Sequence, residues 1–155
     1  MLRHNPVPPL SYATIFVKDS VATVSVDSDL ADVLVTQWTN NGESKNCTPD
    51  KDNSKITITK TGTYYIDFHA SVDLDSGVTV TLHLEGYLGG VVMPQIHSHR
   101  TVTAVGKGSM SSGAFVNIAT VPVDLDIRAN IDNATARDLT VEDAQLNVNR
   151  VGPAS

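Results

Sequence analysis

The feature that most constrains the fold of this chain is an alternation of apolar and polar residues that recurs from about residue 12 onward. The alternation is clearest in residues 77–85, where every second residue from Val78 to Leu84 is apolar, and it returns in residues 64–73 and 124–131. Successive side chains of a β-strand point to opposite faces of the sheet. The pattern therefore predicts strands that each have one buried face and one solvated face.

Short clusters of Asn, Asp and Gly separate the alternating segments, and residues 39–42, 75–77 and 89–90 are examples. These residue types tolerate the positive φ of tight turns, so the clusters predict hairpins and crossovers. The Gly- and Ser-rich residues 106–113 are interpreted as a flexible loop, and residues 29–35 have room for one helical turn. Further strand candidates, which bring the expected total to about nine or ten, are residues 13–18, 21–26, 32–38, 55–60, 92–105, 114–121 and 139–150. Many short strands with regular turns predict an all-β sandwich.

Composition agrees with this fold class and excludes several functions. The 155 residues include 20 valines and 16 threonines, which favour strands, and the length suffices for one domain with its own core. The single cysteine, Cys47, excludes a disulfide scaffold. A formal net charge of −6 argues against a nucleic-acid partner, because gripping phosphates needs a concentrated Lys/Arg surface. No apolar run suits a signal peptide or a membrane span, so we expect synthesis in a cytoplasm, no membrane contact, and no glycan on Asn46 or Asn133.

The N-terminus differs from the rest of the chain. Its prolines favour extended backbone and remove ladder donors, so residues 1–11 are expected to form an arm, followed by one domain over residues 12–152 and a tail over 153–155. The arm could lie on its own domain or dock on a neighbouring subunit or partner. Its candidate partner-binding residues are Leu2, Arg3, Val7, Pro8, Pro9 and Leu10.

No arrangement of residues typical of an enzyme is found in the sequence. Residues 106–113 have the wrong spacing for a nucleophile elbow and lack the phosphate-binding glycine patterns. Cys47 has no histidine near it in the sequence, so a loop or core thiol is the favoured interpretation. We expect no catalytic residue, no cofactor and no enzymatic activity.

Two kinds of residue pair are candidate metal ligands. His97 and His99 would lie on one face of a strand, about 7 Å apart by the strand rise, which suits a site shared across a symmetry axis better than chelation by one chain. Carboxylates also alternate, and Asp73 with Asp75, placed before a predicted turn, is the best candidate for two calcium ligands. Surface or hydrogen-bonding roles are the favoured interpretation for both pairs, so no metal is expected.

Three stretches carry a resemblance to a known family. Residues 40–50 and 56–59 supply a loop and a short strand ahead of residues 62–72, a Gly-x-Tyr-x-hydrophobic-x-Phe strand. This order resembles the front half of the jelly rolls shared by tumour necrosis factor and the complement globular head. Residues 137–148, which include Thr-Val-Glu-Asp, are similar to the last strand of the versions found in tailed-phage structural proteins. The resemblance spans roughly residues 12–152.

The resemblance implies a two-sheet jelly roll that assembles as a compact homotrimer. Because little chain remains outside this domain, we expect a capsid decoration (cement) protein that binds the major capsid protein, and other virion proteins, on the exterior of a phage capsid. The arm would serve as a strap. The alternative is the receptor-binding head of a tail fibre or spike, with Tyr87, Lys107 and Met110 on the loops 86–94 and 106–113 as candidate recognition residues. A secreted signalling ligand is disfavoured because no export signal is found.

Overall fold

The structure is a computed structural model that describes residues 10–27, 32–75, 77–103 and 105–155. The arm residues Leu2, Arg3, Val7, Pro8 and Pro9 lie outside these ranges. No helix within the described ranges is long and apolar enough to cross a membrane. The described strands are β1 (Tyr12–Val17), β2 (Thr23–Val26), β3 (Val33–Leu34), β4 (Asn40–Lys45), β5 (Cys47–Asp50), β6 (Lys55–Ile58), β7 (Gly62–Asp75), β8 (Val80–Leu88), β9 (Val91–Val102), β10 (Val105–Ile118), β11 (Val123–Ile131) and β12 (Arg137–Gly152).

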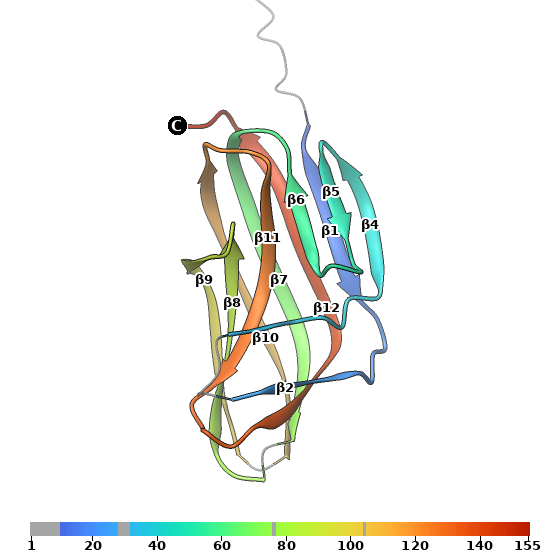
Figure 1. The fold of residues 1–155 in the computed structure, drawn as a ribbon, viewed down its shortest axis with the longest axis vertical. Coiled ribbons are helices and arrows are strands. Elements are labelled where there is room, and N and C mark those ends of the chain that lie inside the picture. The colour runs from blue at the N-terminus through green and yellow to red at the C-terminus, as the bar shows by residue number, and fades with distance from the viewer. Residues whose placement is uncertain (1–9, 28–31, 76, 104) are drawn as a thin grey trace, which may run out of the picture.

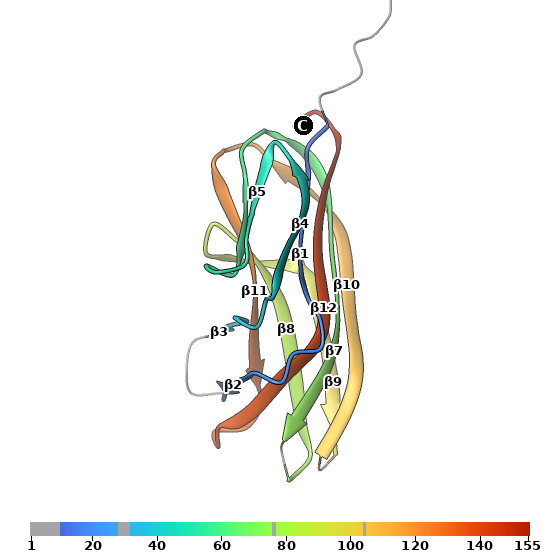
Figure 2. The same cartoon turned by 90° about the vertical axis from the view of Figure 1, so that its right-hand side faces the viewer.

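These strands form two sheets that pack face to face (Figures 1 and 2). The first sheet has the order β10-β7-β12-β1-β4, with β2 paired to one end of β12. The second sheet has the order β5-β6-β11-β8-β9, with β3 paired to β11. Neighbours in each sheet are antiparallel, and most are distant in sequence, as in the pairing of β1 with β12. The chain is an all-β, two-sheet jelly roll.

The core lies between the two sheets and is filled by the alternating positions of the sequence. In β7 every second residue from Tyr64 to Leu74 is buried, while the intervening side chains are exposed or half-buried. The second sheet contributes Leu82 and Leu84 from β8, and Leu125 from β11 is fully buried as well. Full burial of each such aliphatic side chain stabilises the fold by roughly 1.5–3 kcal/mol. The predicted alternation of buried and solvated faces is confirmed.

Two predicted loops are strands in the structure. Residues 39–42 were expected to form a turn, but β4 begins at Asn40 and pairs with β1. Gly42 fits there because a Cβ would lie only 3.1 Å from Thr14. Residues 106–113 were expected to form a flexible loop, but they belong to β10 and pair with β7 throughout. The glycines of this strand allow close cover by β9, since a Cβ on Gly108 would lie 2.1 Å from Arg100 Nε.

Other local predictions have mixed outcomes. The turn at residues 89–90 is confirmed, because Gly89 and Gly90 have φ of 58° and 77° and join β8 to β9. The helical turn expected in residues 29–35 is wrong for its described part, where Val33 and Leu34 form β3. Nine or ten strands were expected, and twelve are found in the described ranges because β4 and β5 are additional short strands.

Candidate functional site

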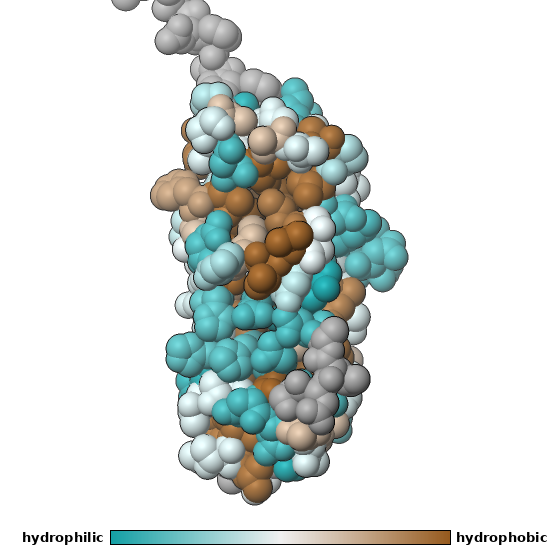
Figure 3. All heavy atoms as spheres, turned by 60° about the vertical axis from the view of Figure 1, so that its left-hand side comes forward, coloured by the Kyte–Doolittle hydropathy of each residue, from teal (hydrophilic) through white to brown (hydrophobic). Residues whose placement is uncertain are grey.

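One apolar surface lies along the side of the sandwich formed by β8 to β11. Figure 1 shows that the β8–β9 turn ends well below the upper ends of β10 and β11, and Figure 3 shows apolar side chains gathered in the upper half of this side. We call this surface the edge patch. It comprises the exposed Val91 (67%) and the half-buried Leu88, Val121 and Val123.

The edge patch is held together by the β8–β9 turn. Leu88 and Val91 are register partners on either side of the turn. A Cβ on Gly89 would lie 3.2 Å from Val123 Cγ2, so the turn rests against β11. Leu88, Val121 and Val123 pack on the core from one side and reach solvent on the other. The patch is therefore an outward extension of the core at this edge.

A second apolar surface lies on the outer face of the first sheet. Tyr65 of β7 and Phe115 of β10 are register partners, with ring centroids 5.1 Å apart and a tilted arrangement. Phe115 is 67% exposed, and Tyr65 is 37% exposed. Val151, in the bulged end of the neighbouring strand β12, is 55% exposed. We call these three residues the aromatic face. Exposed aromatic side chains of this kind are enriched in protein interfaces.

Two of the candidate recognition residues lie in strand β10. Lys107 is exposed, and its Nζ lies 2.5 Å from Glu142 Oε1 and 3.9 Å from Asp73 Oδ2. The hydrogen bond with Glu142, and then its charge, raise the pKa of Lys107. Met110 faces the core and is only 3% exposed, so its expected position on a recognition loop is wrong. The alternation of β10 puts these two residues on opposite faces of the sheet.

Tyr87 also lies in a strand rather than in the expected loop over residues 86–94. Its hydroxyl donates a hydrogen bond to Asp32, which accepts a second one from Asn130 Nδ2 at 2.6 Å. The Arg128 guanidinium lies 4.2 Å from the centre of the Tyr87 ring and is itself held by Asp126 at 2.8 Å. Burial, and then the bond to Asp32, raise the pKa of Tyr87 to about 12. The network ties Asp32, the residue just before β3, to β8 and β11 of the second sheet.

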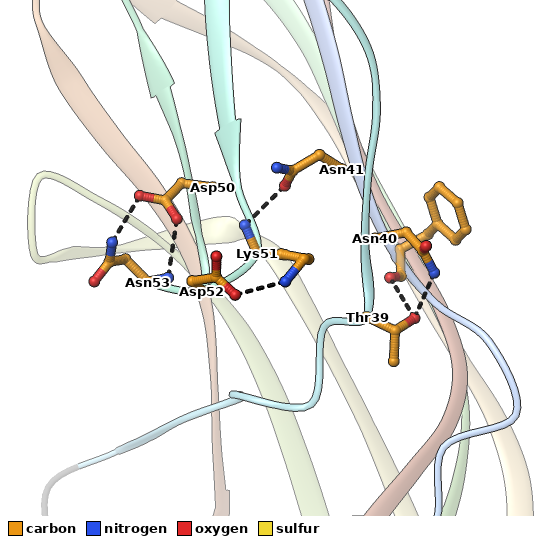
Figure 4. A network of polar contacts seen from close by, with 8 residues as sticks. Thr39, Asn40, Asn41, Asp50, Lys51, Asp52 and Asn53 are labelled. Atoms are coloured by element: carbon orange, nitrogen blue, oxygen red, sulfur yellow. Dashed lines mark hydrogen bonds and ion pairs between the residues drawn. The ribbon is translucent and has the colours of Figure 1, made fainter.

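The carboxylate pairs have local partners in the structure. Figure 4 shows Asp50 accepting hydrogen bonds from the backbone N–H and the side-chain amide of Asn53, at 3.1 and 2.8 Å, while Asp52 pairs with Lys51 at 2.6 Å. These contacts close the β5–β6 turn, and Asn41 Oδ1 braces it by accepting from the Lys51 backbone at 2.8 Å. This acidic pair serves the turn.

Asp73 and Asp75 are the last residues of the same face of β7, not residues of a turn as expected. Together with Asp138, they line an open hollow of about 350 Å³. Lys107 approaches this group from β10. Three carboxylates therefore share this hollow.

His97 and His99 lie on β9, and the structure brings a third histidine from β8 beside them. His83 of β8 is the register partner of His99, and its Nδ1 lies 3.1 Å from His97 Nε2. The ring centroids are 5.4 Å apart for His83 and His97, 5.9 Å for His83 and His99, and 5.5 Å for His97 and His99. The expected 7 Å separation within the pair was therefore too large. Burial, and then the charges of the other two rings, lower the pKa of His83.

Cys47 is buried in the core, and burial raises the pKa of its thiol to about 11. At neutral pH the thiolate, which is the nucleophilic form, is nearly absent. The interpretation of Cys47 as a core thiol is confirmed.

No family model and no curated protein matches the chain. Among solved structures, it is similar to the globular domain of zebrafish complement 1qA protein, with a TM-score of 0.66 and 15% identity over 94% of this chain and 99% of that one. It is also similar to Eiger TNF from S. frugiperda, with a TM-score of 0.64 and 12% identity over 95% and 96%. Murine APRIL at pH 5.0 gives a TM-score of 0.55 and 15% identity over 92% and 100%. The fold is thus a jelly roll like those of tumour necrosis factor and complement globular domains, which confirms the resemblance as far as the fold.

Proposed function

We propose that the chain is a non-enzymatic assembly module, a homotrimeric jelly roll that decorates the outside of a capsid by binding the major capsid protein. The observation that carries the proposal is the pair of exposed apolar surfaces, the edge patch and the aromatic face. Apolar surface of this extent on a folded domain marks interaction sites. The virion setting rests on the resemblance of residues 137–148 to the last strand of tailed-phage structural proteins.

The two surfaces suit a ring because they differ and lie on different sheets. When one surface of a copy binds another surface of the next copy, the contact is heterologous, and it closes into a ring if the rotation between copies allows. In the proposed trimer, the edge patch of one subunit covers the aromatic face of its neighbour. Phe115 and Val91, each 67% exposed in the single chain, would both become buried.

The proposed strap leaves the domain at Leu10. Leu10 is 58% exposed, and its carbonyl accepts a hydrogen bond from Asn46 Nδ2 at 2.7 Å, so the backbone is held where the arm leaves the domain. Figures 1 and 2 show that the C-terminus lies near this point. A ring would therefore present three arms from one end. Three linked contacts raise avidity through effective concentration without requiring any one of them to be strong.

Light scattering of the isolated full-length chain tests the assembly. We expect a mass about three times the 16.5 kDa of one chain, and dissociation of the trimer when Val91 is replaced by serine. Val21→Ser is the matched control, because Val21 is 90% exposed and belongs to neither surface. A monomeric wild-type chain, or equal dissociation by the control, would overturn the proposal.

Co-sedimentation with purified capsids tests the decoration step separately. We expect the trimer to bind capsids and a variant without residues 1–9 to bind more weakly while remaining trimeric. Undiminished binding by that variant would rule out the strap. A trimer that does not bind capsids at all would rule out decoration and leave the assembly intact.

A further inference from the structure

We propose that His83, His97 and His99 form a binding site for a borderline transition-metal ion, with Zn²⁺ as the reference case, on the outer face of the β8–β9 hairpin. The proposal is independent of the assembly surfaces, and it comes from the juxtaposition of one histidine on β8 with two on β9. Imidazole is a preferred ligand of zinc, copper and nickel.

The distances within the cluster match those around a single ion. With zinc–nitrogen bonds of about 2.0–2.1 Å and tetrahedral angles, two ligand nitrogens lie about 3.3 Å apart, and the centres of their rings lie about 5 Å apart. The observed distance of 3.1 Å between His83 Nδ1 and His97 Nε2 is close to the first value. The three centroid separations of 5.4, 5.5 and 5.9 Å are all close to the second. Each ring is therefore within reach of one common ion.

His97 is stacked with His83 at an interplanar angle of 18° and with His99 at 28°, and the His83–His99 pair is tilted at 34°. Within the described ranges, no three His, Cys, Asp or Glu side chains are already arranged to hold a metal ion. Binding therefore requires the rings to turn. His99 is exposed and the His97 side chain is 34% exposed, so both have room to do so. The χ2 torsion of histidine is broad, which keeps the cost of turning low.

The surroundings favour a cation. Glu85, the register partner of His97, places its Oε1 4.0 Å from His97 Nε2 and could supply an oxygen ligand. Asp32 and Asp132 act on His83 as further negative charges. The nearest arginine in β9, Arg100, extends across Gly108 of β10, away from the histidines.

Calorimetric titration of the full-length, tag-free chain with ZnCl₂ at pH 7.5 tests the site. We expect one saturable ion per chain, and an affinity at least roughly tenfold lower in His83→Ala and in His97→Ala, since even outer-shell partners of a metal contribute 10- to 100-fold. His69→Ala is the matched control, because His69 is an exposed histidine on β7 of the other sheet. Affinity should also fall as the pH is lowered, because protons compete with the metal for the imidazole nitrogens.

Circular dichroism shows whether each variant is folded. If His83→Ala is unfolded, the zinc affinity of the exposed His99→Gln variant tests the site in its place. Co²⁺ absorption gives a second readout, with a tetrahedral nitrogen-ligand band expected in the wild type and lost in His99→Gln. Absence of saturable binding in the wild type would overturn the proposal, and the 3.1 Å contact would then be only a hydrogen bond between two neutral rings. Equal weakening by His69→Ala, or unchanged binding in the cluster variants, would overturn it as well.

Discussion

Replacing Phe115 by serine should dissociate the proposed trimer while leaving the single chain folded. Phe115 is 67% exposed in the chain, and an aromatic side chain has roughly 200 Å² of surface, so roughly 130 Å² would leave water in the assembly. At about 25 cal/mol per Å², this burial stabilises each interface by about 3 kcal/mol. A closed trimer has three such interfaces, which together contribute about 9 kcal/mol.

This energy sets the size of the effect in a dilution series. About 9 kcal/mol corresponds to roughly six powers of ten in the trimer dissociation constant. The concentration at which half the chains are trimeric varies as the square root of that constant, so we expect it to rise roughly a thousandfold. Sedimentation velocity over a range of concentrations measures it directly.

Two controls separate loss of assembly from loss of folding. Val21→Ser should leave the midpoint concentration unchanged, because Val21 lies on neither apolar surface. Urea unfolding of the Phe115→Ser monomer should show only a small change, since the surface that this ring buries within the chain is mainly its contact with Tyr65. A midpoint shift of less than tenfold in the Phe115 variant would refute the burial of Phe115 between subunits.

Three further predictions concern the single chain. Leu84→Ala should lower the free energy of unfolding by about 2–5 kcal/mol in urea titrations, because Leu84 is 1% exposed and its removal leaves a cavity between the sheets; a loss under 1 kcal/mol would contradict the packing. Tyr87→Phe should cost about 1–3 kcal/mol by the same assay, because Asp32 loses its hydroxyl donor, and an unchanged stability would show that the bond is not formed in solution. Hydrogen bonds from Lys55 and a neighbouring threonine lower the pKa of Asp124 in the folded state. The stability that the ionised Asp124 carboxylate gives to the fold is therefore present at neutral pH and is lost as the pH falls through the lowered pKa. Thermal melts should therefore show Asp124→Asn to be less stable than the wild type at pH 7 and nearly equal to it at the acid end, and a difference independent of pH would contradict this assignment.

The alternating strands could be predicted from the sequence because the residues of the buried face are apolar and those of the solvated face are polar. In β7, Ala70 and Val72 face the core while His69 and Ser71 face solvent, and this period of two is visible without any long-range information. Residues 106–113, which form most of β10, could not be predicted in this way. Their glycines favour a loop when only the local sequence is considered. The close approach of Arg100 from β9 explains why a glycine, Gly108, occupies this place in a strand.

The histidine cluster was only half visible in the sequence for a related reason. His97 and His99 are adjacent on one strand face, but the position of His83 depends on the register of the β8–β9 hairpin. Leu88 pairs with Val91, and an unbroken hairpin continued from there would place His83 opposite Ile96. The bulge between Glu85 and Tyr87 shifts the register so that His83 meets His99 instead. Bulges of this kind leave no clear local signal.

An electron-microscopy map of the capsid particle that we propose the protein decorates tests the central claim most directly. The account predicts hundreds of copies, arranged as trimers on the outer surface of the capsid, with the end that carries Leu10 and the C-terminus toward the shell. A handful of copies at a tail or a vertex would indicate adsorption to a host in place of decoration. Monomers on the particle, or no copies on its exterior, would contradict the account.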